Sequence, residues 1–353
     1  MEWLAGNRIR GTTAERPEYG LPSGSVGGWK ELGRSTLSGT SQDLSVSSLP
    51  DKRYYMVLSD CIRTVSGTQY IQPDFRFNDD SGNNYSSRWS GNGGSEGTLT
   101  SYNRVHQGVT TDEGAMFQVS YISNLAGKEK LVIGHEGQPR LSGSTYVPSR
   151  AEWVGKWANT SDAIHTINTW ESGTGSYASG SETVILGWDP DDTHTDNFFE
   201  ELASVTASGS STNLSSGTIT AKKYLWIQAQ YSKSSNGTLT TTFNNDTGSN
   251  YSFRKSTNGG SDSTFTSQAS IAEGYSQSQI AFLNMFIINN TSNEKLVMAH
   301  TVLADGTGAG TAPTRIEYVG KWANTSNQIT EIDLDSSGGN FDNHSMIKVW
   351  GAD

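Results

Sequence analysis

The sequence predicts an all-β protein made of two tandem homologous antiparallel β-sandwich domains, each jelly-roll-like, behind an extended N-terminal arm. Three observations predict this. Of the 353 residues, 39 are glycine and only 17% are charged, so polar turn formers replace the usual helix formers. Apolar residues alternate with a period of two between Gly- and Asn-rich turns. A long stretch of sequence also occurs twice.

An internal repeat sets the domain organisation. The residues Val154–Ser161 recur unchanged as Val319–Ser326, an offset of 165 positions. Glu129–Val132 recurs as Glu294–Val297 at the same offset. Solenoid repeats are about 20–50 residues long, so a period of this length indicates two complete domains.

The repeat divides the chain into four parts. We expect an arm at 1–25, a first sandwich domain at 26–188, a linker at 189–196 and a second sandwich domain at 197–353. The linker is polar and rich in turn formers. The repeat unit is longer than an immunoglobulin domain of about 100 residues, which favours an eight-stranded jelly roll.

Short β-branched and aromatic runs predict the strands. In chain order they include 54–59, 131–133, 152–157, 183–186, 225–231, 282–288 and 317–322. The run at 54–59 is apolar on both faces. The repeated run that contains Gly155 is expected to lie centrally, with its glycine at a bulge or a close contact and its tryptophans between the sheets. The only helical feature expected is a turn near 198–202.

Composition and charge exclude several classes of protein. The net charge of -11 argues against nucleic acid as a partner, because phosphates require clustered Lys and Arg. An aromatic content of 10% argues against disorder. The single cysteine, Cys61, is expected to be a buried hydrophobe. No signal peptide and no apolar run of about 20 residues is visible, so we expect no membrane partner.

Motifs that carry chemistry are sparse. Gly93–Gly97 matches the G-x-S-x-G pattern, but its Gly-rich context predicts a hairpin turn. Asp79, Asp80 and Asp246 lie in loops, where backbone hydrogen bonds are favoured over a bound cation. We therefore predict no catalytic, cofactor-binding or metal-binding residue and no cofactor.

Histidine and tryptophan positions raise two further possibilities. His135 and His300 occupy equivalent positions, and a structural hydrogen bond is favoured over catalysis. Trp157 and Trp322 are repeated within strands and are expected in the core. Trp89 is matched by a lysine in the second copy, so it is the candidate for contact with a host surface glycan.

Several segments resemble virion proteins of tailed bacteriophages, of a type common among marine phages. They are Trp29–Arg34, Leu49–Leu58, Phe77–Asn78, Asn84–Tyr85, Val154–Ser161 and Gly180–Asp189, with the opening Trp3–Thr12. The resemblance covers nearly the whole chain. It implies β-sandwich domains in a particle-surface protein, on the capsid or on the tail, and brings no catalytic motif.

The resemblance implies a function. We expect a non-enzymatic structural component of a tailed-phage virion, such as a capsid decoration protein, a head fibre or a tail component. It would be made in the host cytoplasm and reside on the virion surface. Its partners would be other virion proteins and further copies of itself, a trimer by analogy. The alternatives are a receptor- or carbohydrate-binding adhesin and a polysaccharide-degrading enzyme, which would need convergent carboxylates.

The arm is expected to take part in assembly. Apolar anchors and charged contacts would come from Trp3, Leu4, Arg8, Ile9, Arg10 and Arg16. The alternative is that the arm packs on its own first domain.

Overall fold

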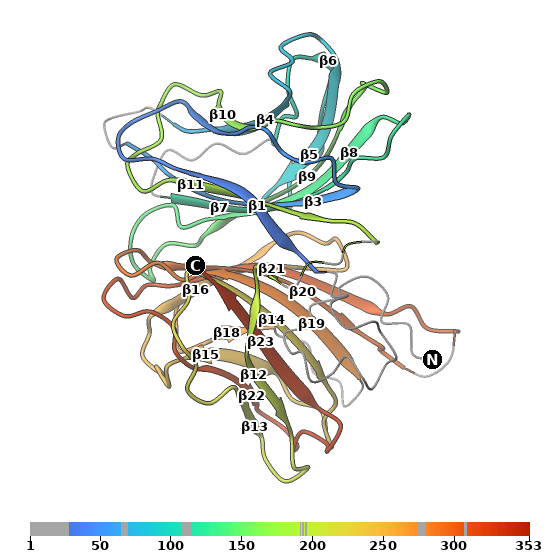
Figure 1. Cartoon of the computed structure of the whole chain (residues 1–353). Helices are drawn as coiled ribbons and strands as arrows, with labels where there is room; N and C mark the ends of the chain where they lie inside the picture. Colours follow the sequence, from blue (N-terminus) through green and yellow to red (C-terminus); the bar gives the residue numbers. More distant parts are fainter. Residues whose placement is uncertain are drawn as a thin grey trace. The chain divides into compact units, whose positions relative to one another are not determined.

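The computed structural model describes residues 28–64, 70–107, 115–190, 192, 194, 196–273, 280–306 and 309–353. Within these ranges every regular element is a β-strand (Figure 1). The strand pairings are antiparallel throughout both large sheets. The prediction of an all-β, antiparallel protein is therefore confirmed.

The described chain divides into two compact units that each draw on several stretches of sequence. The first holds residues up to Gly91, Ser95–Glu136 and Ala151–Glu200; the second holds Asn92–Gly94, Gly137–Arg150 and Glu201–Asp353. The segment Gly137–Arg150 therefore falls inside the predicted first domain by sequence but belongs to the second compact unit.

The first unit consists of a large and a small sheet. The large sheet has the order β1-β11-β3-β7-β8-β9-β5-β6. Its strands are β1 (Lys30–Thr36), β3 (Tyr54–Ile62), β5 (Tyr85–Gly91), β6 (Gly97–Tyr102), β7 (Ala115–Ser123), β8 (Lys130–Gln138), β9 (Ser149–Trp157) and β11 (Glu182–Trp188). A small sheet, β2-β10-β4, lies across one face (Figure 1). It comprises β2 (Asp43–Val46), β4 (Pro73–Phe77) and β10 (Ile167–Glu171).

The second unit has the same order of strands in its large sheet, β12-β23-β14-β19-β20-β21-β16-β17. These are β12 (Glu200–Thr206), β14 (Tyr224–Tyr231), β16 (Tyr251–Thr257), β17 (Ser263–Gln268), β19 (Ala281–Ile288), β20 (Lys295–Leu303), β21 (Thr314–Trp322) and β23 (Met346–Ala352). The small sheet is β13-β22-β15-β18. Its strands are β13 (Asn213–Ser215), β15 (Leu239–Phe243), β18 (Ile271–Ala272) and β22 (Ile332–Ser336).

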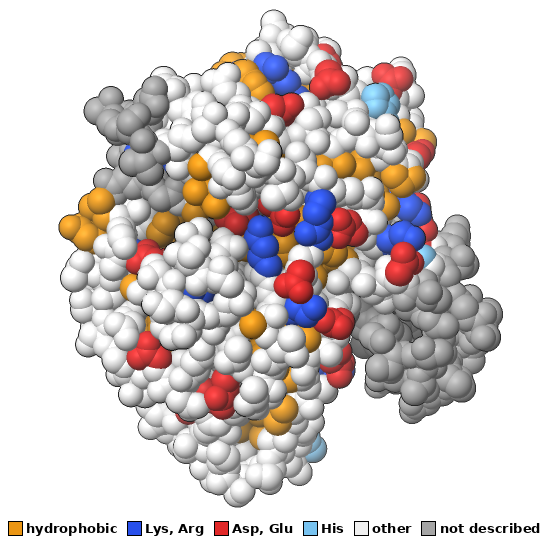
Figure 2. Space-filling model, turned by 60° about the vertical axis from the view of Figure 1, so that its left-hand side comes forward, with side chains coloured by type: hydrophobic (Ala, Val, Ile, Leu, Met, Phe, Trp, Pro, Cys, Tyr) orange, Lys and Arg blue, Asp and Glu red, His pale blue; other side chains and the backbone are white. Residues whose placement is uncertain are grey.

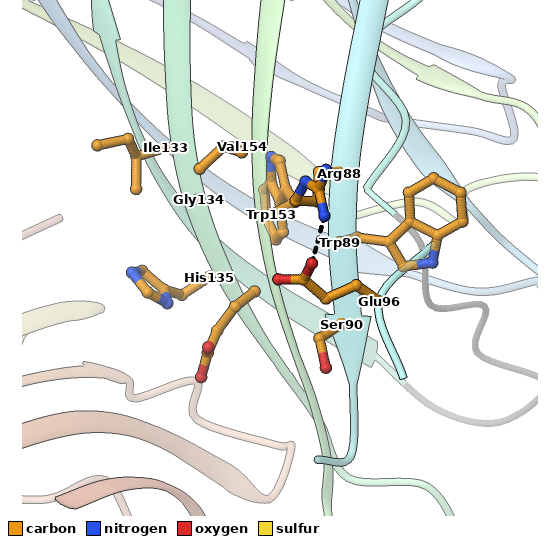
Figure 3. A pocket seen from close by; sticks show the side chains of 10 residues that line it. Arg88, Trp89, Ser90, Glu96, Ile133, Gly134, His135, Trp153 and Val154 are labelled. Carbon is orange, nitrogen blue, oxygen red and sulfur yellow. Dashed lines mark hydrogen bonds and ion pairs between the residues drawn. The ribbon is translucent and has the colours of Figure 1, made fainter. Parts of the chain in front are cut away.

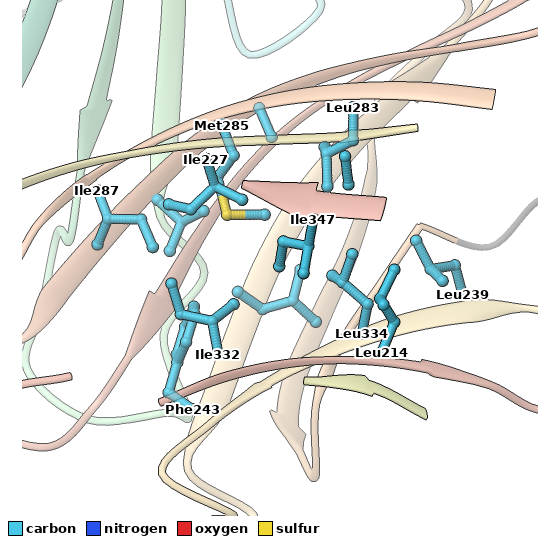
Figure 4. Packing of buried hydrophobic residues seen from close by; sticks show 14 of the residues in the cluster. Leu214, Ile227, Leu239, Phe243, Leu283, Met285, Ile287, Ile332, Leu334 and Ile347 are labelled. Atoms are coloured by element: carbon cyan, nitrogen blue, oxygen red, sulfur yellow. The ribbon is translucent and has the colours of Figure 1, made fainter. Parts of the chain in front are cut away.

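The core of each unit lies between its large and its small sheet. In the second unit, Phe243 and Ile332 of the small sheet pack against Ile227 and Met285 of the large sheet (Figure 4). In the first unit the equivalent layer includes Trp157. This arrangement is sandwich-like and explains the period of two, because alternate side chains of one strand face the two sides of a sheet.

Several predictions about single strands are confirmed. β3 is buried on both faces, as its continuous apolar sequence indicates. β9 lies between β8 and β5 rather than at an edge. Gly155 marks a close contact, since a Cβ added there would lie 2.4 Å from Cγ1 of Val105. The helical turn expected near 198–202 is wrong, because strand β12 begins at Glu200 and its Leu202 fits over Gly351.

The close contact at Gly155 predicts that a larger residue at this position lowers the stability of the first unit. Gly155→Ala is expected to destabilise the first unit by roughly 1–3 kcal/mol, because the added methyl group overlaps Val105 in a packed core. The change is measured as a shift in the urea unfolding midpoint. Gly39→Ala is the matched control, since no atom lies within 4 Å of a Cβ built there. Equal midpoints for the two variants would contradict the prediction.

Candidate docking surface

The structure places only some of the candidate residues. The arm residues Trp3, Leu4, Arg8, Ile9, Arg10 and Arg16 lie outside the described residues. Trp89 lies on β5 and is half-buried. Its indole contacts the His106 ring edge-on at a centroid distance of 4.6 Å and packs over Gly97. Much of its surface is therefore used inside the first unit, and its glycan contact stays a prediction.

Trp157 and Trp322 are core residues, as predicted, and each is 1% exposed. Their indole N–H groups donate to Asp80 and Asp246, with N–O distances of 2.7 Å in both cases. Each aspartate also accepts a backbone N–H from its own loop, which confirms the backbone hydrogen bonding expected there. Burial alone would raise the pKa of Asp80, but these hydrogen bonds outweigh burial and hold it below its usual value.

Two further expectations about the sequence motifs are confirmed. Cys61 is buried in a small apolar cluster, and burial raises the pKa of its thiol well above the usual range. Gly93–Gly97 connects the paired strands β5 and β6 as a hairpin turn. His135 lines a pocket on the first unit, and His300 lies on β20, where burial lowers its pKa.

One buried carboxyl group of the second unit lies at a position where the first unit has an amide. Glu273 is 1% exposed and accepts a hydrogen bond from the Tyr231 hydroxyl at 2.8 Å. Burial raises the pKa of Glu273 to about 7, although the hydrogen bonds from Tyr231 and other hydroxyls oppose the shift. The first unit has a buried glutamine, Gln107, at the equivalent position.

The raised pKa of Glu273 predicts that the stability of the second unit depends on pH. An unfolded glutamate titrates near pH 4.3, so between about pH 4 and pH 7 the folded second unit retains a proton that the unfolded chain has released. We expect the stability of this unit to be full at low pH and to decline as pH rises through about 7. Glu273→Gln should remove this decline. Burial also raises the pKa of Glu171 in the first unit to about 7, so Gln107→Glu should make an existing decline of that unit steeper. Urea midpoints at pH 5 and pH 8 check this, and an unchanged decline in Glu273→Gln would contradict it.

An exposed apolar patch lies on the outer side of the first unit's large sheet. Leu131 and Ile133 of β8 are each 54% exposed, and Val154 of β9 is 47% exposed. They line a groove of about 550 Å³ together with Leu99 and Lys156. On the face that Figure 2 shows, most of the surface is neither charged nor hydrophobic. A cluster of exposed apolar side chains is a candidate binding surface.

Charged pairs border the patch. Lys156 lies 3.0 Å from a Glu129 carboxylate oxygen, and both side chains are about two-fifths exposed. Arg88 is paired with Glu96, and both line a pocket with Ile133 and Val154 (Figure 3). We call this surface the open face and define it by Ser86, Arg88, Glu96, Ser101, Glu129, Leu131, Ile133, Glu152, Val154 and Lys156.

The same surface of the second unit is covered. Leu296, Met298 and Val319 correspond to Leu131, Ile133 and Val154, but they are only 2%, 6% and 4% exposed. The segment Gly137–Arg150, which we call the docked segment, lies on them. A Cβ added at Gly137 would lie 3.4 Å from Met298 and 3.5 Å from Val319.

A buried lysine anchors the docked segment. The Lys321 side chain, fully buried, donates to the backbone oxygens of Pro139 and Leu141 at 3.1 and 2.6 Å. It also lies 3.1 Å from Glu294. Glu294 accepts the backbone N–H of Gly143 at 2.5 Å. Lys321 and Glu294 are the counterparts of the exposed pair Lys156 and Glu129.

Further hydrogen bonds run along the docked segment to its end. The backbone oxygens of Ser144, Tyr146 and Pro148 accept from Ser267, Ser252 and Arg254 at 2.8, 2.8 and 3.1 Å. At the end, Arg150 is paired with Asp262 at 2.9 Å and with Glu317 at 3.5 Å. The second unit therefore binds this irregular connecting segment mainly through backbone atoms of the segment.

Comparisons with known proteins identify no family. No family model and no curated protein matches the chain. It is similar to the Neisserial surface protein A (8% identity, 81% of this chain and 99% of that chain covered, TM-score 0.13). It is also similar to domains LG4-5 of the mouse laminin alpha1 chain (10%, 92% and 91%, TM-score 0.16). TM-scores this low carry no argument about the fold. Among the described residues, no helix is long and apolar enough to cross a membrane.

Proposed function

We propose that this protein is a non-enzymatic structural component of a tailed-phage virion, such as a capsid decoration protein, a head fibre or a tail component. The observation that carries the proposal is the open face. A sheet surface with exposed Leu131, Ile133 and Val154 and bordering ion pairs is suited to binding another polypeptide. The sequence resemblance to virion proteins supports the same role.

We also propose that the two units arose by duplication of one jelly-roll-like sandwich. The repeat offset of 165 positions and the identical order of strands in the two large sheets support this origin. The two units then carry the same type of docking surface, which is filled in the second unit and open in the first.

The proposed role includes a place and partners. The protein would be made in the host cytoplasm and reside on the virion surface. It would contact other virion proteins and further copies of itself, and a trimer is the expected homo-oligomer. The arm at 1–25 would add contacts through Trp3, Leu4 and Ile9.

Purified particles test the virion role. Infectious particles are banded on a density gradient, washed in high salt and examined by mass spectrometry and by labelling with an antibody raised against this chain. The proposal expects a constant number of copies per particle and labelling of intact particles. Loss of the protein on purification, with infectivity retained, would contradict it.

A polar pocket on the first unit favours an adhesin as the second candidate. It has a volume of about 270 Å³ and is lined by Asp43, Arg76, Asp79, Asn168 and Trp170. Oδ1 of Asp43 and Oδ1 of Asn168 are buried with no hydrogen-bond partner among the described residues, and both would accept from a sugar hydroxyl if the pocket opened enough to admit it. However, Arg76 covers the Trp170 ring at 3.9 Å, which occupies the face that a sugar would stack on.

A glycan array probed with the whole chain tests the adhesin. The adhesin expects binding that Asp43→Ala abolishes and that Asn213→Ala, at the equivalent position of the second unit, leaves unchanged. Absence of any bound glycan would exclude this candidate and leave the structural role in place.

A further inference from the structure

We propose that the open face binds the β20–β21 connection of a second copy of this chain through residues 302–306 and 309–315, in the way that the second unit binds the docked segment. The inference rests on the proposed structural role and names its partner. It makes the contact between copies heterologous: the first unit of one copy accepts the β20–β21 connection of the next.

The open face retains the groups that hold the docked segment. The counterparts of Ser252, Arg254, Ser267, Glu294, Glu317 and Lys321 are Ser86, Arg88, Ser101, Glu129, Glu152 and Lys156, and Glu96 replaces Asp262. Even the backbone agrees, since Ser101 and Ser267 have left-handed φ values of 51° and 50°.

Residues 302–315 correspond to the docked segment at the repeat offset of 165. They connect β20 to β21 as the docked segment connects β8 to β9. The equivalent residues Arg140 and Asp305 both adopt a left-handed turn, with φ values of 57° and 47°. Residues 307 and 308 lie outside the described residues.

The sequences of the two segments differ, but the contacts tolerate the difference. The second unit binds the docked segment through the backbone oxygens of Pro139, Leu141, Ser144, Tyr146 and Pro148. The side chains at the two largest of these positions stay about two-fifths exposed. The smaller residues of the connection offer backbone oxygens at the same positions. Gly306, the counterpart of Leu141, has a φ of 127°, so the connection must adjust there to present its oxygen in the same direction.

Charge and apolar surface also match. Arg315 corresponds to Arg150 and is more than half exposed, although it is paired with Glu317 of its own chain at 3.2 Å. In the contact it would exchange this exposed pair for Glu96 and Glu152, the counterparts of the residues that Arg150 reaches. Val302 corresponds to Gly137 and is 43% exposed. In the second unit, the backbone of Gly137 covers part of the apolar surface. In the contact between copies, the Val302 side chain would cover the equivalent apolar surface of the first unit, which is exposed.

A heterologous contact has a consequence for assembly. Repetition of the same contact closes into a ring or continues as a filament, whereas an isologous contact stops at a dimer. The trimer expected from the sequence is one closed form of this contact.

Cysteine pairs test the register of the contact. In the second unit, a Cβ added at Gly137 would lie 3.7 Å from Cβ of Val319, within the usual range for a disulfide. The equivalent pair between two copies is Val302 and Val154. The chain's own Cys61 is buried and does not compete.

The single variants Val154→Cys and Val302→Cys are oxidised alone and as a mixture, on the full-length chain. We expect a disulfide-linked dimer mainly in the mixture, and a ladder or ring from the double variant. Arg315→Glu in the Val302→Cys chain should lower the yield about tenfold by placing like charges together. The intrachain pair Gly137→Cys/Val319→Cys is the positive control for oxidation.

Two results would overturn the inference. One is a mixture that yields no more dimer than the single variants alone. The other is a yield that Arg315→Glu leaves unchanged. The virion role is tested separately, by the presence of the protein in purified particles. If the protein is present in particles but the crosslink does not form, only the contact between copies is contradicted. If the crosslink forms but the protein is absent from particles, only the virion role is contradicted.

Discussion

Met298→Asp is expected to destabilise the second unit by roughly 3–5 kcal/mol, because an unpaired charge replaces an apolar side chain that is 6% exposed. Ile133→Asp, at the equivalent position of the first unit, is expected to change stability by less than about 0.5 kcal/mol, because that side chain is 54% exposed. The same substitution at equivalent positions is thus expected to change stability by very different amounts, because only Met298 lies under the docked segment.

Urea unfolding followed by hydrogen-exchange mass spectrometry measures the two variants unit by unit, because a two-unit chain need not unfold in one step. Peptides from β19 to β21 report on the second unit, and peptides from β7 to β9 report on the first. A loss of similar size in both variants would mean that the first unit's surface is already covered, which contradicts an open face.

Lys321→Ala is expected to lower the stability of the second unit by roughly 3–5 kcal/mol, since it leaves Glu294 buried without its cation and two backbone oxygens buried without their donor. Burial lowers the pKa of Lys321 and the nearby Glu294 opposes this shift. Lys156→Ala removes an exposed pair and should cost less than about 1 kcal/mol.

The double variant Lys321→Met/Glu294→Gln separates loss of the charge from loss of packing. It should regain part of the stability, because a buried pair replaced by groups of similar shape leaves no unpaired charge. Thermal unfolding at pH 7 compares these variants. Equal losses for Lys321→Ala and Lys156→Ala would show that the docked segment does not depend on the lysine.

The sequence predicts the strands well where the pattern is local. The apolar residues of β3 and β9 are themselves enough to predict that these strands are buried. A glycine within a strand indicates a close contact, and Gly155 has one. The error at 198–202 has a different cause. Two phenylalanines followed by two glutamates carry no alternation, and β12 forms because a sheet edge is available to it.

The docking surface could not be found in this way. Leu131 and Leu296 lie in identical Glu-Lys-Leu-Val segments, yet one is 54% and the other 2% exposed. No local pattern distinguishes them, because burial depends on which segment lies above. The repeat did contain an indication of the docking surface. Polar residues around the open face, such as Arg88 and Lys156, are repeated in the second unit together with the core residues. Trp89, chosen because it does not recur, lies at the edge of this surface.

Lysine acylation in intact particles tests the central claim most directly. Lys156 is exposed and its counterpart Lys321 is fully buried, so brief treatment of the isolated chain with an acylating reagent should modify Lys156 and spare Lys321. If the open face binds another copy, Lys156 becomes protected in assembled particles to the level of Lys321. Equal modification of Lys156 in the isolated chain and in the particle would show that this face stays uncovered and would contradict the claim.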